Sequence, residues 1–134
     1  MCNGSSARVS QGGTIAILHP TSTLSSVTGK IVFTHSTSGN TIASFEISDA
    51  RDITGYSVVI HQTGDTRVPT QHAGLLHNFR LVDHGASCAN AVEMTVPEYY
   101  DFGAGGDGII GRRVSVFEDS FDREPVVEGV IGWN

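Results

Sequence analysis

Short runs of β-branched and aromatic residues, interrupted by glycine and serine about every ten residues, dominate this sequence and restrict it to few folds. Valine and isoleucine number 24, against 14 for leucine and alanine together. This bias favours strands, because β-branched side chains pack well on a pleated sheet. No window of 11 or more residues has the apolar spacing of a helix. The pattern predicts eight strands, at residues 14–18, 30–34, 41–47, 56–61, 79–82, 91–96, 113–118 and 126–131.

Eight short strands in 134 residues predict one all-β domain over residues 1–134, an eight-stranded Greek-key β-barrel or sandwich. A chain of this length buries roughly two-thirds of the surface of its unfolded state, so it needs neither disulfides nor a metal merely to fold. Residues 102–108 are rich in glycine but lack the lysine of a phosphate-binding loop. We therefore expect them to form a plain flexible connection.

The charge balance excludes some classes of partner. The chain has 14 acidic and eight basic residues, a formal net charge of -6 and a single lysine, Lys30. It therefore has no basic stripe to bind a phosphate backbone, and nucleic acid is not an expected partner. No apolar run approaches the roughly 20 residues that cross a bilayer, so no membrane span is expected.

The two cysteines, Cys2 and Cys88, are too few for a disulfide scaffold and too far apart in sequence for a zinc knuckle. They can form a disulfide with each other if the protein is secreted, and the glycosylation sequon at Asn3 would fit that compartment. The alternative is two unrelated thiols. Sequence alone leaves both readings open.

Four motifs follow one another as they do in copper/zinc superoxide dismutases: HQTGD at 61–65, HAGLLHN at 72–78, IIGR at 109–112 and EGVIG at 128–132. The corresponding motifs of that family read H-x-H-x-x-G-D, H-x-G-D-L-x-N, I-I-G-R followed by V-H-E, and A-C-G-V-I-G. The sequence therefore resembles this family from about residue 29 to its end. The resemblance implies an eight-stranded Greek-key barrel, in agreement with the strand count.

The resemblance also implies where copper ligands belong, because a superoxide dismutase holds a redox-cycling copper ion in a cage of imidazoles. The second histidine of H-x-H is His61, whereas the first position is Val59. The histidine of V-H-E is replaced by Phe117. We therefore expect Val59 and Phe117 to be lost ligand positions. His61 falls on a copper-ligand position. The resemblance places His72 at a position that is a zinc ligand in zinc-containing members of the family, and the short loop before it leaves a bridging copper role open. His61 and His72 together suggest a partial copper site, with His77 as a conceivable third ligand.

Two loops that complete the metal site of the family are short here. Only residues 66–71 separate the first two motifs, and Glu128 takes the place of the cysteine in A-C-G-V-I-G. The zinc aspartate has no clear counterpart, so zinc is not expected. The sequence predicts a domain without a cofactor, and bound copper is the alternative. In its short loops the sequence resembles the copper-only superoxide dismutases, which include repeat domains of larger animal proteins. In its loss of metal ligands it resembles the inactive poxvirus homologues.

The sequence favours a non-catalytic superoxide-dismutase-like domain that acts as a structural or interaction module, with a protein partner or a neighbouring repeat domain. The alternative is a copper-binding domain with residual dismutase activity. An extracellular location is expected, and an intracellular viral homologue is the alternative. Residues 129–133 resemble part of the dimer patch of the family, so monomer and homodimer both remain open. The aromatic stretch 97–102 fits rim packing of the barrel better than an exposed binding patch.

Overall fold

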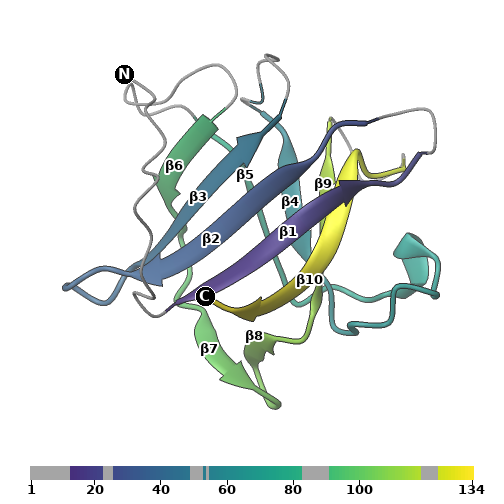
Figure 1. Ribbon diagram of the computed structural model, residues 1–134. Coiled ribbons are helices and arrows are strands. Elements are labelled where there is room, and N and C mark those ends of the chain that lie inside the picture. Colours follow the sequence, from purple (N-terminus) through teal and green to yellow (C-terminus); the bar gives the residue numbers. More distant parts are fainter. Residues whose placement is uncertain (1–12, 23–25, 49–52, 54, 83–90, 119–123) are drawn as a thin grey trace.

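The computed structural model describes residues 13–22, 26–48, 53, 55–82, 91–118 and 124–134, which are almost entirely β-stranded (Figure 1). The elements along the chain are β1 (Thr14–Pro20), β2 (Gly29–His35), β3 (Thr41–Ile47), β4 (Ser57–Ile60), the 3₁₀ helix η1 (Thr70–His72), β5 (His77–Arg80), β6 (Ala91–Thr95), β7 (Asp101–Ala104), β8 (Gly108–Ile110), β9 (Arg113–Phe117) and β10 (Val127–Trp133).

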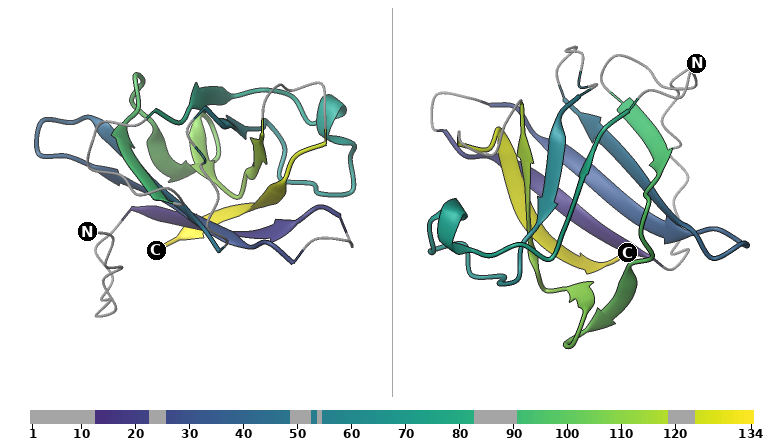
Figure 2. Two further views of the ribbon diagram at one scale, coloured as in Figure 1. Left: turned by 90° about the horizontal axis from the view of Figure 1, so that it is seen from above. Right: turned by 180° about the vertical axis from the view of Figure 1, so that it is seen from behind.

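Eight of these strands form one antiparallel sheet in the order β5-β4-β9-β10-β1-β2-β3-β6. The sheet curls into two facing layers, as the view from above shows (Figure 2). The pair β1–β10 joins the layers. Because β3 pairs with β6 and β4 pairs with β9, the chain crosses between the layers in the Greek-key manner. The predicted fold class is therefore confirmed.

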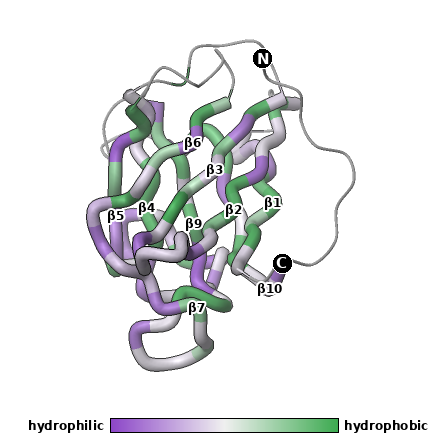
Figure 3. The backbone as a smooth tube through the Cα atoms, turned by 90° about the vertical axis from the view of Figure 1, so that its left-hand side faces the viewer, coloured by the Kyte–Doolittle hydropathy of each residue, from purple (hydrophilic) through white to green (hydrophobic). Residues whose placement is uncertain are grey.

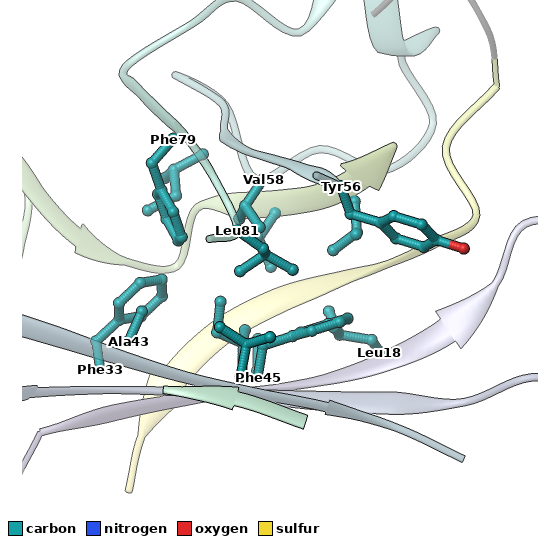
Figure 4. Close-up of a cluster of buried hydrophobic side chains, with 14 of the residues drawn as sticks. Leu18, Phe33, Ala43, Phe45, Tyr56, Val58, Phe79 and Leu81 are labelled. Atoms are coloured by element: carbon teal, nitrogen blue, oxygen red, sulfur yellow. The ribbon is translucent and has the colours of Figure 1, made fainter. Parts of the chain in front are cut away.

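The hydrophobic core fills the space between the two layers. Leu18, Phe33 and Phe45 point into it from one layer and meet Val58 and Phe79 from the other (Figure 4). The rings of Phe33 and Phe79 meet edge-to-face, with their centroids 6.2 Å apart. Such pairs stabilise a core beyond the effect of burial alone.

The strands β4 and β9 are buried along their whole length, whereas β1 and β3 alternate between buried and more exposed residues. Alternation of hydropathy along the strands is visible in Figure 3. A strand with one solvated face alternates in this way, and a strand covered on both faces does not. The outer face of β4 and β9 must therefore be covered by other parts of the chain.

All eight predicted strands are present, and their ends differ from the prediction by at most two residues. The prediction for residues 102–108 is wrong. The segment contributes to β7 and β8, which pair in parallel, and the Arg112 guanidinium donates hydrogen bonds to the carbonyls of Gly106 and Gly108. Cys2 and Cys88 lie outside the described residues. No helix within the described residues is long and apolar enough to cross a membrane.

Candidate functional site

The candidate site lies on the outer face of β4 and β9. Val58 and Ile60 belong to the core cluster, so the alternate residue Val59 points to the opposite face. The same holds on β9, where Val114 and Val116 face the core. Val59 lies opposite Ser115 in the ladder, and Ser57 lies opposite Phe117.

The two positions that the resemblance marks as lost ligands are therefore diagonal neighbours on one face. Val59 is 3% exposed and Phe117 is 2% exposed. Both side chains are packed away from solvent, and neither has a lone pair that could bind a metal ion.

His61 follows the last residue of β4 and extends the ladder, because its backbone N–H donates to the Arg113 carbonyl at 2.8 Å. Its side chain is 3% exposed. The ring nitrogen Nδ1 lies 2.8 Å from the Gly74 carbonyl oxygen and must donate to it, because a carbonyl only accepts. Nε2 lies 2.9 Å from the Ser115 hydroxyl. Both ring nitrogens are thus engaged by the protein.

Ser115 connects His61 to a buried ion pair. Its Oγ lies 3.2 Å from Glu128 Oε2, and the same carboxylate oxygen accepts from Arg113 Nε at 3.0 Å and Nη2 at 2.9 Å. The Arg113 side chain is buried, and Glu128 is about three-quarters covered. We call His61, Ser115, Glu128 and Arg113 the outer-face cluster. In this cluster each buried polar group has a hydrogen-bonding partner, as a stable interior requires.

Burial lowers the pKa of the His61 imidazole below 6.5, and the positive charge of Arg113 acts in the same direction. The hydrogen bond to the Gly74 carbonyl and the negative charge of Glu128 act in the opposite direction without reversing the shift. His61 is therefore neutral near pH 7. In this state Nδ1 carries the proton, and Nε2 and Glu128 Oε2 are both acceptors for the single hydroxyl proton of Ser115, which lies within hydrogen-bonding distance of each.

The segment between β4 and β5 covers the outer-face cluster. Arg113 Nη1 donates to the carbonyls of Val68 at 2.6 Å and Asp65 at 3.3 Å, and Nη2 donates to Thr70 Oγ1 at 3.0 Å. A Cβ at Gly64 would lie 1.9 Å from the Gly111 carbonyl oxygen, so only glycine allows this approach. The Arg113 guanidinium and the close contact at Gly64 thus help to hold the shortened loop against the barrel.

The other two predicted ligands lie in different surroundings. His72 ends the helix η1 and is exposed. His77 begins β5, where its ring stacks on Tyr100 at 4.1 Å and its Nδ1 lies 3.4 Å from a carboxylate oxygen of Glu98. Within the described residues, no three His, Cys, Asp or Glu side chains are grouped closely enough to hold a metal ion.

Ser115 and Arg113 are the residues of the candidate site that sequence reasoning missed. The strand pattern predicts that β9 is buried but does not show which of its residues are polar partners of His61. The strict alternation of strand residues was the available signal, because a serine and an arginine two residues apart on a buried strand must share a face. This face also carries the candidate ligand positions.

The solved structures that resemble the chain in fold include two from one organism. Both are mutants of superoxide dismutase 5 from Candida albicans. One is 15% identical in sequence, with a TM-score of 0.57, and the match covers 91% of this chain and 92% of that chain. The other is 18% identical, with a TM-score of 0.55, and the match covers 94% and 91%.

Neither protein-family models nor curated protein sequences give a match. At these identities the likeness establishes the fold, which agrees with the order of the sequence motifs. The chain is accordingly a Greek-key β-barrel of the copper/zinc superoxide dismutase type.

Proposed function

We propose that this protein is a non-catalytic superoxide-dismutase-like domain that serves as a structural or interaction module. The observation that carries the proposal is the state of the outer face of β4 and β9. There His61 has both ring nitrogens engaged in protein hydrogen bonds, and the two other candidate ligand positions hold buried Val59 and Phe117. This face is built as a packed surface with a satisfied polar cluster.

The donor set does not fit a redox-cycling copper centre. Such a centre needs several imidazoles at fixed places so that it binds both oxidation states of copper. Copper at His61 Nε2 would first have to displace the Ser115 hydroxyl, and Val59 and Phe117 offer no further donor. Replacing polar ligands by apolar side chains instead stabilises the barrel without an ion, because buried polar groups without partners are costly.

Zinc has even less support. Aligning HAGLLHN with H-x-G-D-L-x-N puts Leu75 at the aspartate position, and Leu75 is an exposed apolar side chain. His72, the other zinc position of that motif, is exposed at the end of η1. A hard carboxylate ligand is thus replaced by a group that cannot coordinate.

The rival function is a partial copper site at His61 and His72 that retains some dismutase activity. The exposed imidazole of His72 favours it, since an exposed histidine is free to bind copper from solution. Such a site would be open to solvent and weak.

A dismutase assay separates the two functions. The purified protein is incubated with one equivalent of Cu(II), desalted, and mixed with superoxide in a stopped-flow instrument. We expect superoxide to decay at the rate seen in protein-free buffer. Decay that increases with protein-bound copper and is lost in the His61→Gln variant would overturn the proposal and establish the rival function.

As a module of this kind, we propose that the domain acts outside the cell, as a monomer or homodimer, through contacts with another protein or a neighbouring domain. The formal net charge of -6 supports this role over the turnover of an anionic substrate, because a negatively charged protein repels such a substrate.

A further inference from the structure

One end of the barrel presents a stack of three rings. The imidazole of His35, at the end of β2, lies between Tyr99 and Phe102. Its centroid is 4.6 Å from that of Tyr99, with an interplanar angle of 14°, and 3.8 Å from that of Phe102, with an angle of 2°. One face of the Tyr99 ring is covered by His35, and Tyr99 is 64% exposed. Its other face is therefore open to solvent.

The stack is held in a fixed orientation by buried neighbours. Tyr100 is fully buried, and its backbone N–H donates to Thr41 Oγ1 at 2.9 Å. The Tyr100 carbonyl accepts a hydrogen bond from His35 Nε2 at 2.8 Å. The Tyr100 ring packs on Phe33 and stacks on His77. Tyr99 is thus an exposed aromatic ring on a rigid support, which lowers the entropic cost of binding a ligand.

The charged residues that neighbour Tyr99 in sequence are all acidic. Residues 96–111 contain three charged residues, Glu98, Asp101 and Asp107, all acidic and all exposed. The next basic residue, Arg112, donates its guanidinium hydrogen bonds to the carbonyls of Gly106, Gly108 and Gln62. The neighbouring turn, residues 36–40, contains no charged residue. Glu98 lies 3.4 Å from His77 Nδ1 through Oε1, and Asp101 Oδ1 accepts a hydrogen bond from the Gly103 N–H at 2.8 Å. Both exposed carboxylates thus lie within two residues of Tyr99 in sequence and carry negative charge at this end of the barrel.

We propose that this surface, defined by Tyr99, Glu98 and Asp101, binds an arginine side chain of a protein partner. A guanidinium stacks flat on a tyrosine face and is attracted by the ring quadrupole, and nearby carboxylates add to the attraction. Arginine suits the surface better than lysine, because a planar, weakly hydrated cation covers the ring at lower desolvation cost. The inference rests on the proposed role as an interaction module and specifies the chemistry of its partner.

Another exposed surface is apolar and serves as a comparison. Ile17, Val130 and Trp133 are exposed on the paired strands β1 and β10, and residues 129–134 carry no acidic residue. Trp133 is 66% exposed, much like Tyr99. Trp133 therefore serves as the control for Tyr99, because it is similarly exposed and aromatic but has no acidic residue beside it in sequence.

The test is a titration of ¹⁵N-labelled protein with a short blocked peptide that contains two arginines, followed by amide chemical shifts. The same peptide with citrulline in place of arginine is the neutral isostere. We expect saturable shifts at residues 98–102 and near His35 with the arginine peptide, and none with the citrulline peptide. Tyr99→Leu should weaken binding by about two- to fivefold. Glu98→Gln with Asp101→Asn should also weaken binding and reduce its dependence on salt.

Trp133→Leu is the control and should leave the affinity unchanged. Equal binding of the citrulline peptide, shifts confined to other surfaces, or full affinity in a folded Tyr99→Leu variant would overturn the inference. Each variant is first checked for the dispersed spectrum of the folded protein. The dismutase assay is independent of this titration. If the protein binds the arginine peptide and also dismutates superoxide, the proposed function is refuted and this inference is not. If the protein has no dismutase activity and does not bind the peptide, this inference is refuted and the proposed function is not.

Discussion

His61 is a buried, neutral imidazole, and its environment makes the stability of the barrel depend on pH. Burial lowers the pKa of His61 in the folded state below the 6.5 of the unfolded chain. As the pH falls below 6.5, the unfolded chain takes up a proton that the folded protein does not. The free energy of unfolding should therefore decrease as the pH is lowered from 7.5 towards 5, and this contribution should level off below the folded-state pKa.

Urea unfolding at several pH values between 7.5 and 5 measures this effect. The His61→Gln variant keeps hydrogen-bonding capacity but cannot titrate, so its stability should vary less with pH over the same interval. If the stability of the variant and of the parent protein depends equally on pH, the pKa of His61 is not lowered in the folded state.

Arg113 combines an ion pair with three hydrogen bonds to the covering loop. Arg113→Lys keeps the charge but cannot reproduce the guanidinium fork. We expect a loss of about 1.5–3 kcal/mol in stability, the typical contribution of a hydrogen bond to a charged group. Amide hydrogen exchange in residues 62–73 should also become faster.

Arg67→Lys is the matched control, because the Arg67–Asp65 pair is on the surface of the same loop. Exposed pairs contribute little to stability, so neither stability nor exchange should change measurably. If Arg113→Lys behaves like Arg67→Lys, the loop is held by contacts other than the Arg113 fork.

Among the elements, the loop between β4 and β5 depends on close backbone contact with the turn before β9. A methyl group at Gly64 would collide with the Gly111 carbonyl. Gly64→Ala should therefore destabilise the protein by about 1–3 kcal/mol, as overpacking does. Gly132→Ala provides the comparison, since a Cβ there meets no atom within 4 Å. Thermal unfolding of both variants measures the difference, and equal melting temperatures would contradict this packing.

The eight main strands could be predicted because their runs of β-branched residues lie between clear breakers. β7 and β8 could not, because they are short and rich in glycine and depend on a parallel pairing that leaves no alternation in the sequence. The sequence likewise placed Val59 and His61 on one face, which the register confirms. It could not reveal that Ser115 and Arg113 complete the hydrogen bonds of that face, since this depends on which strands become neighbours.

In the molecule as a whole, the two layers and the core form the superoxide dismutase-type barrel, while the surface where the motifs predict metal chemistry is packed and hydrogen-bonded. The fold alone therefore does not assign the function, because one architecture supports different sites. In the function that we propose, the surface around Tyr99 is the region that contacts a partner.

The most direct test is a copper titration, read by electron paramagnetic resonance, of the parent protein and of the Val59→His plus Phe117→His variant. The substitutions return two imidazoles to the face that carries His61. A variant with Val59→Gln plus Phe117→Gln controls for added polarity, and circular dichroism verifies that each variant folds.

We predict no tightly bound, nitrogen-coordinated copper in the parent protein or the glutamine variant, and a nitrogen hyperfine signal with higher affinity in the histidine variant. Tight nitrogen-coordinated copper in the parent protein would contradict our conclusion that the outer face of β4 and β9 lacks the ligands for a copper ion. Unchanged affinity in a folded histidine variant would contradict the placement of Val59 and Phe117 at ligand positions.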